Sequence, residues 1–598
     1  MTNAHRYLEI VRSRGIRRKP LRKVYRNMRN EALFLMAYSH LYANNGATTP
    51  GVDCEDTVDG MSVERIRKIL KDLEEGRFTW KPVKRTYIEK KFSSALRPLG
   101  IPSWTDKLVQ EVIRMILEAY YEPQFRPCSH GFRPNKGCHT ALTEIYRTWA
   151  GVKWFIETDI KGCFETIDHD VLTGILRRHI EDERFLKLIR GMLKAGYVDG
   201  WEYHRTYSGT PQGGIVSPLL ANIMLHEVDV YIEDVLIPNH TRGTTRKSNT
   251  AYQTARQRAI RAKKRGDRQA YKDAKTLQRS LPVGDPMDSE YARLRYVRYA
   301  DDSLFGFIGT KAEAEQIKCE VRHFCETLKL AVSDEKTLIT HARTGKARFL
   351  NYLIGVIWDN AKIAGANGRK IRGRNGQIIL TVPEDVPKSW IMGVKRERKI
   401  IRHRCELQNN SDYDIIMSYE SKVQGLINYY ELAHDVYSKM SRIRYVYKES
   451  LLKTLAAKHH TSSTKIAKKY RQYTADGRKI IAVTIERKQK PPLVASYGRK
   501  PIRQNRNAIP HDEKPPMTIH RTELLERLLH STCEVCGEKG YVEGHHIRKL
   551  KDLRRSKEKP KWAQIMIAMK RKTLFVCKKC HTDIHAGRYD GAQLTQFC

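Results

Sequence analysis

The sequence lacks any apolar run long enough to cross a membrane, and it has few acidic residues for its number of basic ones. Among 598 residues, 110 are Lys or Arg and 67 are Asp or Glu, giving a formal net charge of +43. The basic start, residues 12–19, is not followed by the apolar stretch of a signal peptide. Such a charge would destabilise the chain by self-repulsion unless a polyanion neutralised it. We therefore expect a multidomain nucleic-acid-binding protein rather than a membrane or secreted one.

The cysteines give no sign of a disulfide framework. The chain has 12 cysteines, and eight are scattered without a pattern, which favours a reduced intracellular compartment. The other four form two Cys-x-x-Cys pairs about forty residues apart, Cys533 with Cys536 and Cys577 with Cys580. Two such pairs can form a tetrahedral four-thiolate Zn²⁺ site that stabilises a domain with a small core.

Two adjacent aspartates, Asp301 and Asp302, follow one strand-like segment and precede another. Residues 294–299 are rich in β-branched and aromatic side chains, and residues 303–308 are apolar, so the sequence predicts a hairpin with both aspartates at its tip. Adjacent carboxylates repel each other unless a divalent cation such as Mg²⁺ lies between them. The alternative is an ordinary solvated turn, where aspartate is common.

A third carboxylate favours the metal site. Asp159 lies at the end of another strand-like segment, residues 154–160. Two-metal phosphoryl transfer uses carboxylates from neighbouring strands to hold ions about 3.5–4 Å apart. One Mg²⁺ would activate a primer 3′-hydroxyl and the other would bind the triphosphate of a nucleotide. Asp159, Asp301 and Asp302 therefore form a candidate catalytic site of a polymerase.

Further blocks of sequence occur in the order known from reverse transcriptases. The chain resembles the bacterial group II intron-encoded type over nearly its whole length. The resemblance implies a right-hand polymerase with fingers and palm. The matching blocks are residues 49–53 (TPGVD), 97–102 (RPLGIP), 129–134 (SHGFRP), 210–214 (TPQGG), 333–337 (SDEKT) and 349–353 (FLNYL).

The resemblance assigns substrate-binding roles to residues near the aspartates. Phe164 stands at the position of the aromatic gate that excludes a ribose 2′-hydroxyl; the alternative is that it is simply a core residue. Arg97 would grip the triphosphate, because guanidinium geometry suits phosphate. Lys90 or Lys91 would assist it, and the sequence does not distinguish between these two lysines.

Two more residues complete the predicted nucleotide site. Gln212 lies beside glycines that would let the backbone approach the nucleotide closely. Lys336 could contact a phosphate, but a surface lysine without a specific role is an equal alternative.

Residues 240–290 form a basic insertion between the Gln212 block and the aspartates. From Arg242 to Glu290 there are thirteen Lys or Arg against five Asp or Glu, and residues 255–265 have a helical pattern. A palm does not need this segment. Our hypothesis is that it grips structured RNA through phosphates, and the alternative is a solvated charged helix.

Past the palm, the pattern becomes helical. Val423, Leu426, Ile427 and Tyr430 are spaced to form one apolar face. A helical thumb is expected, and the segments GLINYY (425–430) and KTLA (453–456) resemble the family's maturase domain, which also contacts the intron RNA. After it come six prolines among basic residues, which indicate an extended linker. The linker would contact DNA or act as a plain spacer.

Histidines accompany the cysteine pairs. His545, His546, His581 and His585 resemble an HNH endonuclease of the ββα-metal type with a structural zinc. The resemblance implies that His546 is the general base and His545 a metal ligand, with His581 or His585 completing a single catalytic Mg²⁺ site. The motif's asparagine is missing, and Thr573 near its position is a poor replacement. The alternative is a zinc-stabilised DNA-binding module without cleavage.

These patterns predict an α+β protein with five regions. The polymerase site should bind two Mg²⁺, the nuclease site one Mg²⁺, and the cysteines one structural Zn²⁺. The predicted regions are residues 1–85 (RNA-binding extension and first reverse transcriptase block), 86–385 (fingers and palm), 386–487 (helical thumb or maturase domain), 488–525 (linker) and 526–598 (HNH endonuclease).

The resemblance implies a multifunctional protein: RNA-directed DNA polymerase, splicing maturase, and DNA endonuclease that nicks its target for target-primed reverse transcription. The expected partners are a group II intron RNA, double-stranded target DNA and deoxynucleotides, without a membrane; a homodimer is left open. The expected location is the bacterial cytoplasm, at the nucleoid. The alternatives are a reverse transcriptase without a splicing role and a splicing cofactor with a non-cleaving zinc module.

Overall fold

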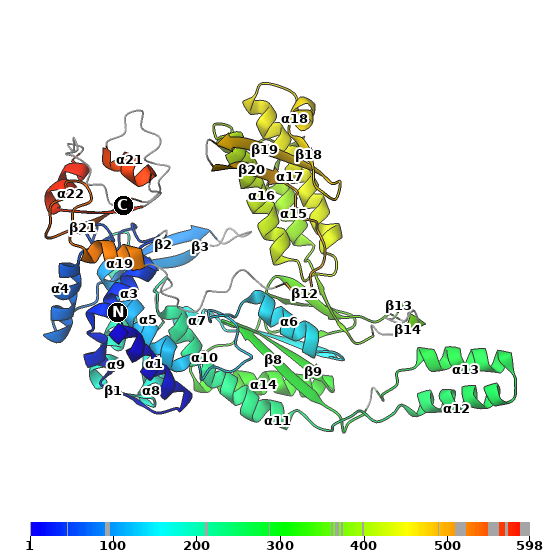
Figure 1. Cartoon of the computed structure of the whole chain (residues 1–598). Helices are drawn as coiled ribbons and strands as arrows, with labels where there is room; N and C mark the ends of the chain where they lie inside the picture. Colours follow the sequence, from blue (N-terminus) through cyan, green and yellow to red (C-terminus); the bar gives the residue numbers. More distant parts are fainter. Residues whose placement is uncertain are drawn as a thin grey trace.

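The structure of the chain is a computed structural model, shown in Figure 1. It mixes helices and strands, in agreement with the predicted class. Among its described helices, none is both long and apolar enough to span a membrane. The described residues are 2–44, 46–89, 96–209, 213–285, 288–359, 363–364, 370–371, 375–396, 400–487, 490–508, 522–547, 561–568 and 572–586.

The chain up to residue 327 is rich in helices. Several of its helices begin at a side-chain cap: the hydroxyl of Ser62 accepts a hydrogen bond from the Arg65 amide at 3.2 Å, and Ser103 and Asp182 cap α5 and α9 in the same way. The helices are α1 (Thr2–Ile16), α2 (Val24–Met28), α3 (Glu31–Leu41), α4 (Val63–Glu74), α5 (Trp104–Tyr121), α6 (Cys138–Thr148), α7 (Cys163–Thr166), α8 (His169–Arg177), α9 (Glu183–Leu193), α10 (Ser217–Tyr231), the π-helix η1 (Ile232–Leu236), α11 (Ile237–Asn239) and α14 (Lys311–Thr327).

A four-stranded antiparallel sheet lies at the centre of the polymerase region. Its order is β10 (Ile339–His341), β4 (Trp154–Asp159), β9 (Asp302–Ile308) and β8 (Arg293–Tyr299). A second sheet has the order β3 (Leu96–Ile101), β2 (Val83–Glu89), β6 (Tyr197–Asp199) and β7 (Glu202–His204), and β1 (Leu21–Arg22) pairs with β5 (Ile180–Glu181).

Alternate residues of the central sheet enter two different cores. On β9, Phe305 and Phe307 pack with the amino-terminal helices, whereas Leu304 packs with α6 and the helical domain. Neighbouring strands follow the same period of two: Ile156 lies on the first face and Phe155 on the second. Because both faces are covered, the sheet is a rigid base for the residues at its end.

The region predicted as the thumb contains helices and a sheet. Val423, Ile427 and Tyr430 are buried and Leu426 packs against them, so the predicted apolar face is confirmed. Its elements are α15 (Asp385–Met392), β16 (Lys395–Arg396), β17 (Ile400–Ile401), the 3₁₀ helix η2 (Cys405–Leu407), α16 (Asp412–Tyr429), α17 (Val436–Lys458), α18 (Ser463–Lys469), β18 (Arg471–Tyr473) and β19 (Lys479–Arg487), and β20 (Lys490–Tyr497) follows it. The strands before it, at the end of the region predicted as fingers and palm, are β11 (Ala347–Phe349), β12 (Tyr352–Val356), β13 (Ile363–Ala364), β14 (Lys370–Ile371) and β15 (Ile378–Thr381).

The predicted linker, residues 488–525, includes a segment that forms a strand of the preceding domain. Strand β20 pairs antiparallel with β19 over most of its length, and the phenol of Tyr497 donates a hydrogen bond to the Arg444 carbonyl at 2.8 Å. Pro491 and Pro492 indicate a linker in the sequence, but β20 is an edge strand. Proline is tolerated there because the outer amides of an edge strand need no partner. The helical domain therefore extends to Tyr497.

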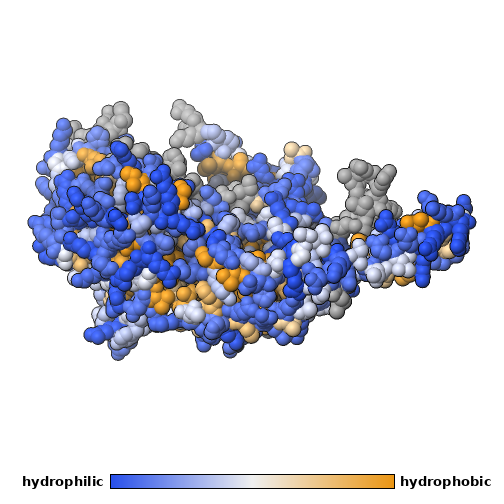
Figure 2. Space-filling model, turned by 90° about the horizontal axis from the view of Figure 1, so that it is seen from below, coloured by the Kyte–Doolittle hydropathy of each residue, from blue (hydrophilic) through white to orange (hydrophobic). Residues whose placement is uncertain are grey.

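The basic insertion forms a helical hairpin of α12 (Thr250–Lys264) and α13 (Arg268–Ser280), one helix more than predicted. The two helices pack through small side chains, with Ala255, Ala259 and Ala274 buried. Figure 1 shows the hairpin extending away from the central sheet, and Figure 2 shows that hydrophilic residues dominate its visible surface. Most of its lysines and arginines are therefore accessible to solvent.

The carboxy-terminal module lies against the amino-terminal helices, with α19 contacting α3 (Figure 1). Leu525 and Leu528 are buried in the same core as residues of α3 and α5. A second, small core surrounds Cys533 and Cys580. The elements are α19 (Thr522–Leu529), β21 (Glu543–His546), α21 (Lys561–Ala568), β22 (Thr573–Val576) and α22 (Lys578–His585), and β21 pairs antiparallel with β22.

Candidate active sites

The aspartates meet at one end of the central sheet, as predicted. Asp302 pairs with Asp159 across β9 and β4, and Tyr299 pairs with Asp302 across β8 and β9. The hairpin between them is closed by Ala300, which has a φ of 56°, and by Asp301. Carboxylates from β4, from β9 and from the turn between β8 and β9 therefore lie at one end of the sheet, and carboxylate oxygens are ligands that Mg²⁺ takes.

The electrostatics of this cluster favour a cation. Burial and the negative charge of Asp301 raise the pKa of Asp302 to about 7, and Asp159 adds to the shift. Burial and the Asp159 charge also raise the pKa of Asp301, whereas Lys336 and Arg97 lower it. Lys336 Nζ donates a hydrogen bond to Asp159 Oδ2 at 2.7 Å. Bound divalent ions would relieve the same repulsion.

This shift predicts competition between protons and Mg²⁺. With a pKa of about 7, Asp302 becomes increasingly protonated as the pH falls, so the Mg²⁺ concentration for half-maximal primer extension should rise several-fold from pH 7 to pH 6. Above pH 7 the carboxylate is already ionised and the requirement should level off. The measurement is a set of Mg²⁺ titrations of primer extension between pH 6 and pH 8.5. A requirement that stays constant from pH 6 to pH 7 would contradict the prediction.

A buried polar network that the sequence did not reveal supports the aspartate turn. Arg298 is 2% exposed, and its guanidinium donates to Asp229 at 2.7 and 2.8 Å, to Asn222 Oδ1 at 3.1 Å and to the carbonyl of Ala300 at 2.8 Å. Asn222 donates to the carbonyl of Gly131 at 2.8 Å. The backbone of the turn is thereby tied to α10.

Gly131 explains why the SHGFRP block lies where it does. A Cβ at Gly131 would collide with the backbone nitrogen of Ala300, so only glycine allows this segment to pack beneath the turn. Ser129, two residues earlier, accepts a hydrogen bond from Arg298 at 2.8 Å. The block thus supports the backbone of the turn that carries the aspartates.

Replacing Asp229 with Asn should destabilise the turn strongly. The substitution leaves the Arg298 guanidinium buried without its counter-charge, which typically costs about 3–5 kcal/mol. We expect faster amide hydrogen exchange in β8 and β9. The control is Asp170→Asn, which removes an exposed ion pair with Arg190 that should contribute no more than about 1 kcal/mol. Equal exchange in the two variants would contradict this role of Asp229.

The predicted nucleotide-binding residues are partly placed. Phe164 lies on α7, half-buried, with its ring edge-on to Phe132 at a centroid distance of 6.3 Å. Arg97 lies on β3, close enough to Asp301 to lower its pKa. Lys90, Lys91 and Gln212 lie outside the described residues.

The ends of the Gln212 loop are nevertheless fixed beside the other predicted residues. Gly209 has a φ of 87°, and a Cβ there would lie 2.7 Å from the Phe164 carbonyl oxygen. Gly213 has a φ of 104°, and a Cβ there would lie 2.8 Å from Leu99 Cδ1. A cavity of about 670 Å³ opens between β2, β3 and residues 205–209, and Glu165 also lines it. Gly209 therefore lies against the Phe164 backbone, and Gly213 lies against the strand that carries Arg97.

The four predicted zinc ligands converge. The sulfur atoms of Cys533, Cys536, Cys577 and Cys580 all lie within 4.8 Å of one another, and those of Cys536 and Cys577 are 3.8 Å apart. The amide of Cys536 donates to the sulfur of Cys533 at 3.4 Å, as expected for a Cys-x-x-Cys turn that carries thiolate charge. This donor set fits a tetrahedral Zn²⁺ ion.

Three of the predicted nuclease histidines converge as well. His545 on β21 and His581 and His585 on α22 lie within 4.8 Å of one another, and a fourth residue, Asp59, joins them. Burial lowers the pKa of His581, but the carboxylates of Asp59 and Glu543 outweigh it and raise this pKa to about 9. Burial lowers the pKa of His545 to about 4, so its imidazole is neutral.

His546 lies outside this cluster. Its Nδ1 donates to the Gly544 carbonyl at 3.0 Å, and its Nε2 lies 3.1 Å from the hydroxyl of Tyr38. Because the carbonyl can only accept, Nε2 carries the lone pair and accepts from Tyr38. Burial lowers the pKa of His546 to about 4. Thr573 pairs with His546 across the two strands and does not join the cluster.

Comparisons with known protein families match the polymerase, maturase and endonuclease regions of the chain. Residues 88–245 match the reverse transcriptase (RNA-dependent DNA polymerase) family, residues 387–496 match the type II intron maturase family, and residues 533–581 match the AI2M/AI1M-like HNH endonuclease family. The group II intron-encoded protein LtrA of Lactococcus lactis subsp. cremoris is 38% identical over 582 residues, covering 94% of this chain and 95% of LtrA.

The chain belongs to the group II intron-encoded proteins. Two fungal relatives agree. An uncharacterized 91 kDa protein in a cob intron of Schizosaccharomyces pombe is 33% identical, covering 95% of this chain and 70% of the relative. The putative COX1/OXI3 intron 1 protein of Saccharomyces cerevisiae is 31% identical, covering 94% and 69%.

This group II intron-encoded protein therefore combines a reverse transcriptase, an intron maturase and an HNH endonuclease, as predicted. The maturase match ends at residue 496, within one residue of the end of β20 at Tyr497. This agreement supports placing β20 in the helical domain rather than in the linker.

Proposed function

We propose that this group II intron-encoded protein binds its intron RNA, promotes its splicing, and copies it into DNA by target-primed reverse transcription. The convergence of Asp159, Asp301 and Asp302 at one end of the central sheet carries the polymerase part. In this scheme the HNH endonuclease nicks double-stranded DNA, and the new 3′-hydroxyl serves as primer. The central sheet would be the palm, β2 and β3 part of the fingers, and α15–α18 with β18–β20 the thumb. Binding to DNA and to intron RNA would keep such a protein at the bacterial nucleoid.

The polymerase residues would have distinct roles in metal and nucleotide binding. Asp159, Asp301 and Asp302 would hold two Mg²⁺ ions, which supply Lewis acidity at the primer hydroxyl and at the triphosphate. Lys336, now paired with Asp159, would be free to contact a phosphate once cations neutralise that carboxylate. Phe164 would exclude a 2′-hydroxyl, and its backbone is held by the tight contact at Gly209. Arg97, with Lys90 or Lys91, would bind the triphosphate, and Gln212 would contact the nucleotide.

The nuclease residues would cleave DNA with a single metal ion and a histidine base. Cys533, Cys536, Cys577 and Cys580 would hold a structural Zn²⁺, while His545, His581 and His585 would bind the catalytic Mg²⁺. His546 would be the general base, because its Nε2 lone pair is oriented by the Nδ1 bond to Gly544. Tyr38 would have to withdraw before this nitrogen could take a proton from water.

The first experiment tests the maturase role. The intron RNA around this reading frame would be transcribed and its self-splicing measured at low Mg²⁺ with wild-type protein and with Asp301→Ala. We expect both proteins to restore splicing, because the RNA-folding role does not use the palm carboxylates. Failure of both proteins would remove the maturase role and leave a reverse transcriptase with a nuclease.

The insertion hairpin should bind phosphates of this RNA. Replacing Arg256, Arg258, Arg261 and Lys264, all exposed on α12, with Gln should weaken binding and lower the slope of log K against log salt. The expected decrease in the slope is about 0.7–0.9 for each phosphate that the variant protein does not neutralise. Filter binding at four or more salt concentrations measures it, and an unchanged slope would contradict the role.

Deletion of the hairpin provides the matching control for folding. Ser248 and Gly284 form an antiparallel bridge, and the amide of Asn249 donates to the Val283 carbonyl at 2.9 Å. The two ends therefore lie side by side, so a short glycine turn can replace residues 250–280. This variant should retain primer extension on a simple RNA template while its salt slope falls.

A further inference from the structure

The carboxylate of Asp59 lies among the nuclease histidines although it comes from the other end of the chain. Asp59 Oδ2 is 2.7 Å from His585 Nε2 and 3.3 Å from His581 Nε2, and Oδ1 is 3.7 Å from His545 Nδ1. The ligand atoms of these four residues all lie within 4.8 Å of one another. One carboxylate and three imidazoles therefore point at a common volume.

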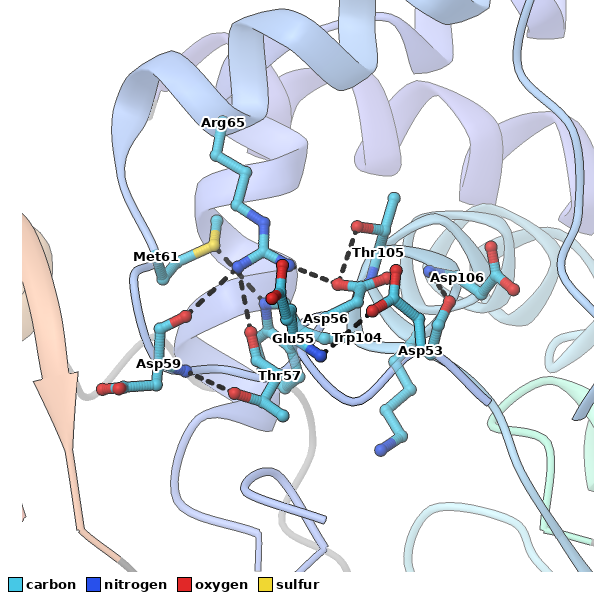
Figure 3. A network of polar contacts seen from close by, with 12 residues as sticks. Asp53, Glu55, Asp56, Thr57, Asp59, Met61, Arg65, Trp104, Thr105 and Asp106 are labelled. Atoms are coloured by element: carbon cyan, nitrogen blue, oxygen red, sulfur yellow. Dashed lines mark hydrogen bonds and ion pairs between the residues drawn. The ribbon is translucent and has the colours of Figure 1, made fainter. Parts of the chain in front are cut away.

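The loop that carries Asp59 is held rigidly. Arg65 forms an ion pair with Asp56 and donates to the carbonyl oxygens of Thr57 at 2.9 Å and Asp59 at 3.3 Å. Figure 3 shows this network, with the Asp59 carboxylate pointing away from it toward a strand of the nuclease module. The backbone is thus fixed by Arg65 while the carboxylate remains available to the histidines.

The nuclease module docks directly onto this loop. Met61 and Gly544 form an antiparallel bridge, with the Gly544 amide 2.9 Å from the Met61 carbonyl and the Gly60 amide 3.0 Å from the Gly544 carbonyl. The amide of His546 donates to Asp59 Oδ1 at 2.7 Å. These bonds place the loop as an added edge of β21, so the position of Asp59 relative to His545 is set by backbone pairing.

His545 is the residue of the cluster whose side chain lacks hydrogen bonds within the described part of the chain. It is 5% exposed, and neither ring nitrogen has a hydrogen-bond partner among the described residues. Its ring centroid lies 5.1 Å from that of His585 and 5.4 Å from that of His581. A buried imidazole without a partner is costly unless something binds it, and a metal ion would satisfy one nitrogen.

We propose that Asp59 is the fourth protein ligand of the nuclease metal site, completing a set with His545, His581 and His585. This inference rests on the proposed nuclease function. Asp59 supplies the oxygen donor that the HNH segment, without its asparagine, does not contain. Three imidazoles and one carboxylate suit Mn²⁺ or another transition ion better than Mg²⁺, which prefers oxygen donors. The nuclease site is thus shared between the reverse transcriptase region and the carboxy-terminal module.

The test uses Fe²⁺ as a cleavage probe on the full-length protein. With ascorbate and peroxide, bound Fe²⁺ generates hydroxyl radicals that cut the chain near the metal. We expect wild-type cuts near residues 59, 545 and 581 and separate cuts near the palm aspartates. In Asp59→Ala the first group should disappear while the palm cuts persist. The matched control is Glu55→Gln, an exposed acid in the same loop, which should keep the wild-type pattern.

Two further variants separate the removal of a metal ligand from misfolding. Asp59→Asn keeps an oxygen that can accept from the His546 amide, and it should still weaken Fe²⁺ and Mn²⁺ binding at the module by about tenfold or more. Asp59→Glu keeps a carboxylate and should restore part of the cutting. Module cuts of wild-type strength and metal dependence in Asp59→Ala would overturn the proposal.

DNA nicking then distinguishes this proposal from the nuclease function itself. With Mn²⁺, Asp59→Asn should nick a target duplex at least about tenfold more slowly than wild type while extending primers normally. If wild-type protein nicks no DNA but its module cuts depend on Asp59, the nuclease function fails and the shared metal site stands. If nicking is robust and independent of Asp59, the nuclease function is supported and the proposal that Asp59 is a metal ligand is wrong.

Discussion

Replacing Asp302 with Asn is expected to reduce primer extension by about 10³-fold or more, because the carboxylate pairs with Asp159 at the end of the sheet and would touch both metal ions. Asparagine keeps the shape and removes the charge, so the fold should persist. The measurement is single-turnover incorporation of one deoxynucleotide on an RNA template at saturating Mg²⁺.

The same variant should bind intron RNA with wild-type affinity and salt slope, since the insertion hairpin and the helical domain are unaltered. Asp170→Asn, an exposed carboxylate on α8, is the control for a general effect of charge and should extend primers within about twofold of wild type. Incorporation by Asp302→Asn within tenfold of wild type would show that the three carboxylates do not act as the metal site.

Replacing Cys577 with Ser should release the zinc and unfold the carboxy-terminal module. Binding of a structural Zn²⁺ typically contributes about 10–16 kcal/mol to folding, far more than the small core around Cys533 can replace. We expect the loss of one zinc per chain by plasma mass spectrometry, rapid proteolysis after about residue 520, and no DNA nicking. Primer extension should be retained.

The control for this substitution is Cys319→Ser, which changes an exposed cysteine on α14 that lies outside the four-cysteine cluster. It should keep the zinc, the protease resistance and the nicking of wild type. Retention of one zinc per chain in Cys577→Ser would mean that the four thiolates do not share a single ion.

Local sequence signals predicted the parts of both sites that lie on regular elements. The hairpin with Asp301 and Asp302 could be predicted because two strand-like runs flank a turn, and the cysteine pairs because their spacing matches a zinc knuckle. The apolar face of α16 followed from a 3.6-residue period.

The parts that were missed depend on contacts between distant segments. Arg298 looks like any charged residue of a strand, and only the fold brings Asp229 and Asn222 to its buried guanidinium. Asp59 carries no motif, and its place beside His585 follows from backbone pairing between Met61 and Gly544. The prolines of β20 outweigh its apolar alternation and predict a linker, and only the pairing with β19 identifies this segment as a strand.

The packing of α19 against α3 bears on how such proteins can lose their nuclease in evolution. Leu525 and Leu528 are buried in the same core as Leu33 and Phe34 of α3, so this part of the polymerase surface is apolar and covered by the module. A deletion that removed only the carboxy-terminal segment would expose these apolar side chains to solvent and favour aggregation. Relatives that have lost the nuclease should therefore carry polar substitutions on the face of α3 that the module covers in this protein.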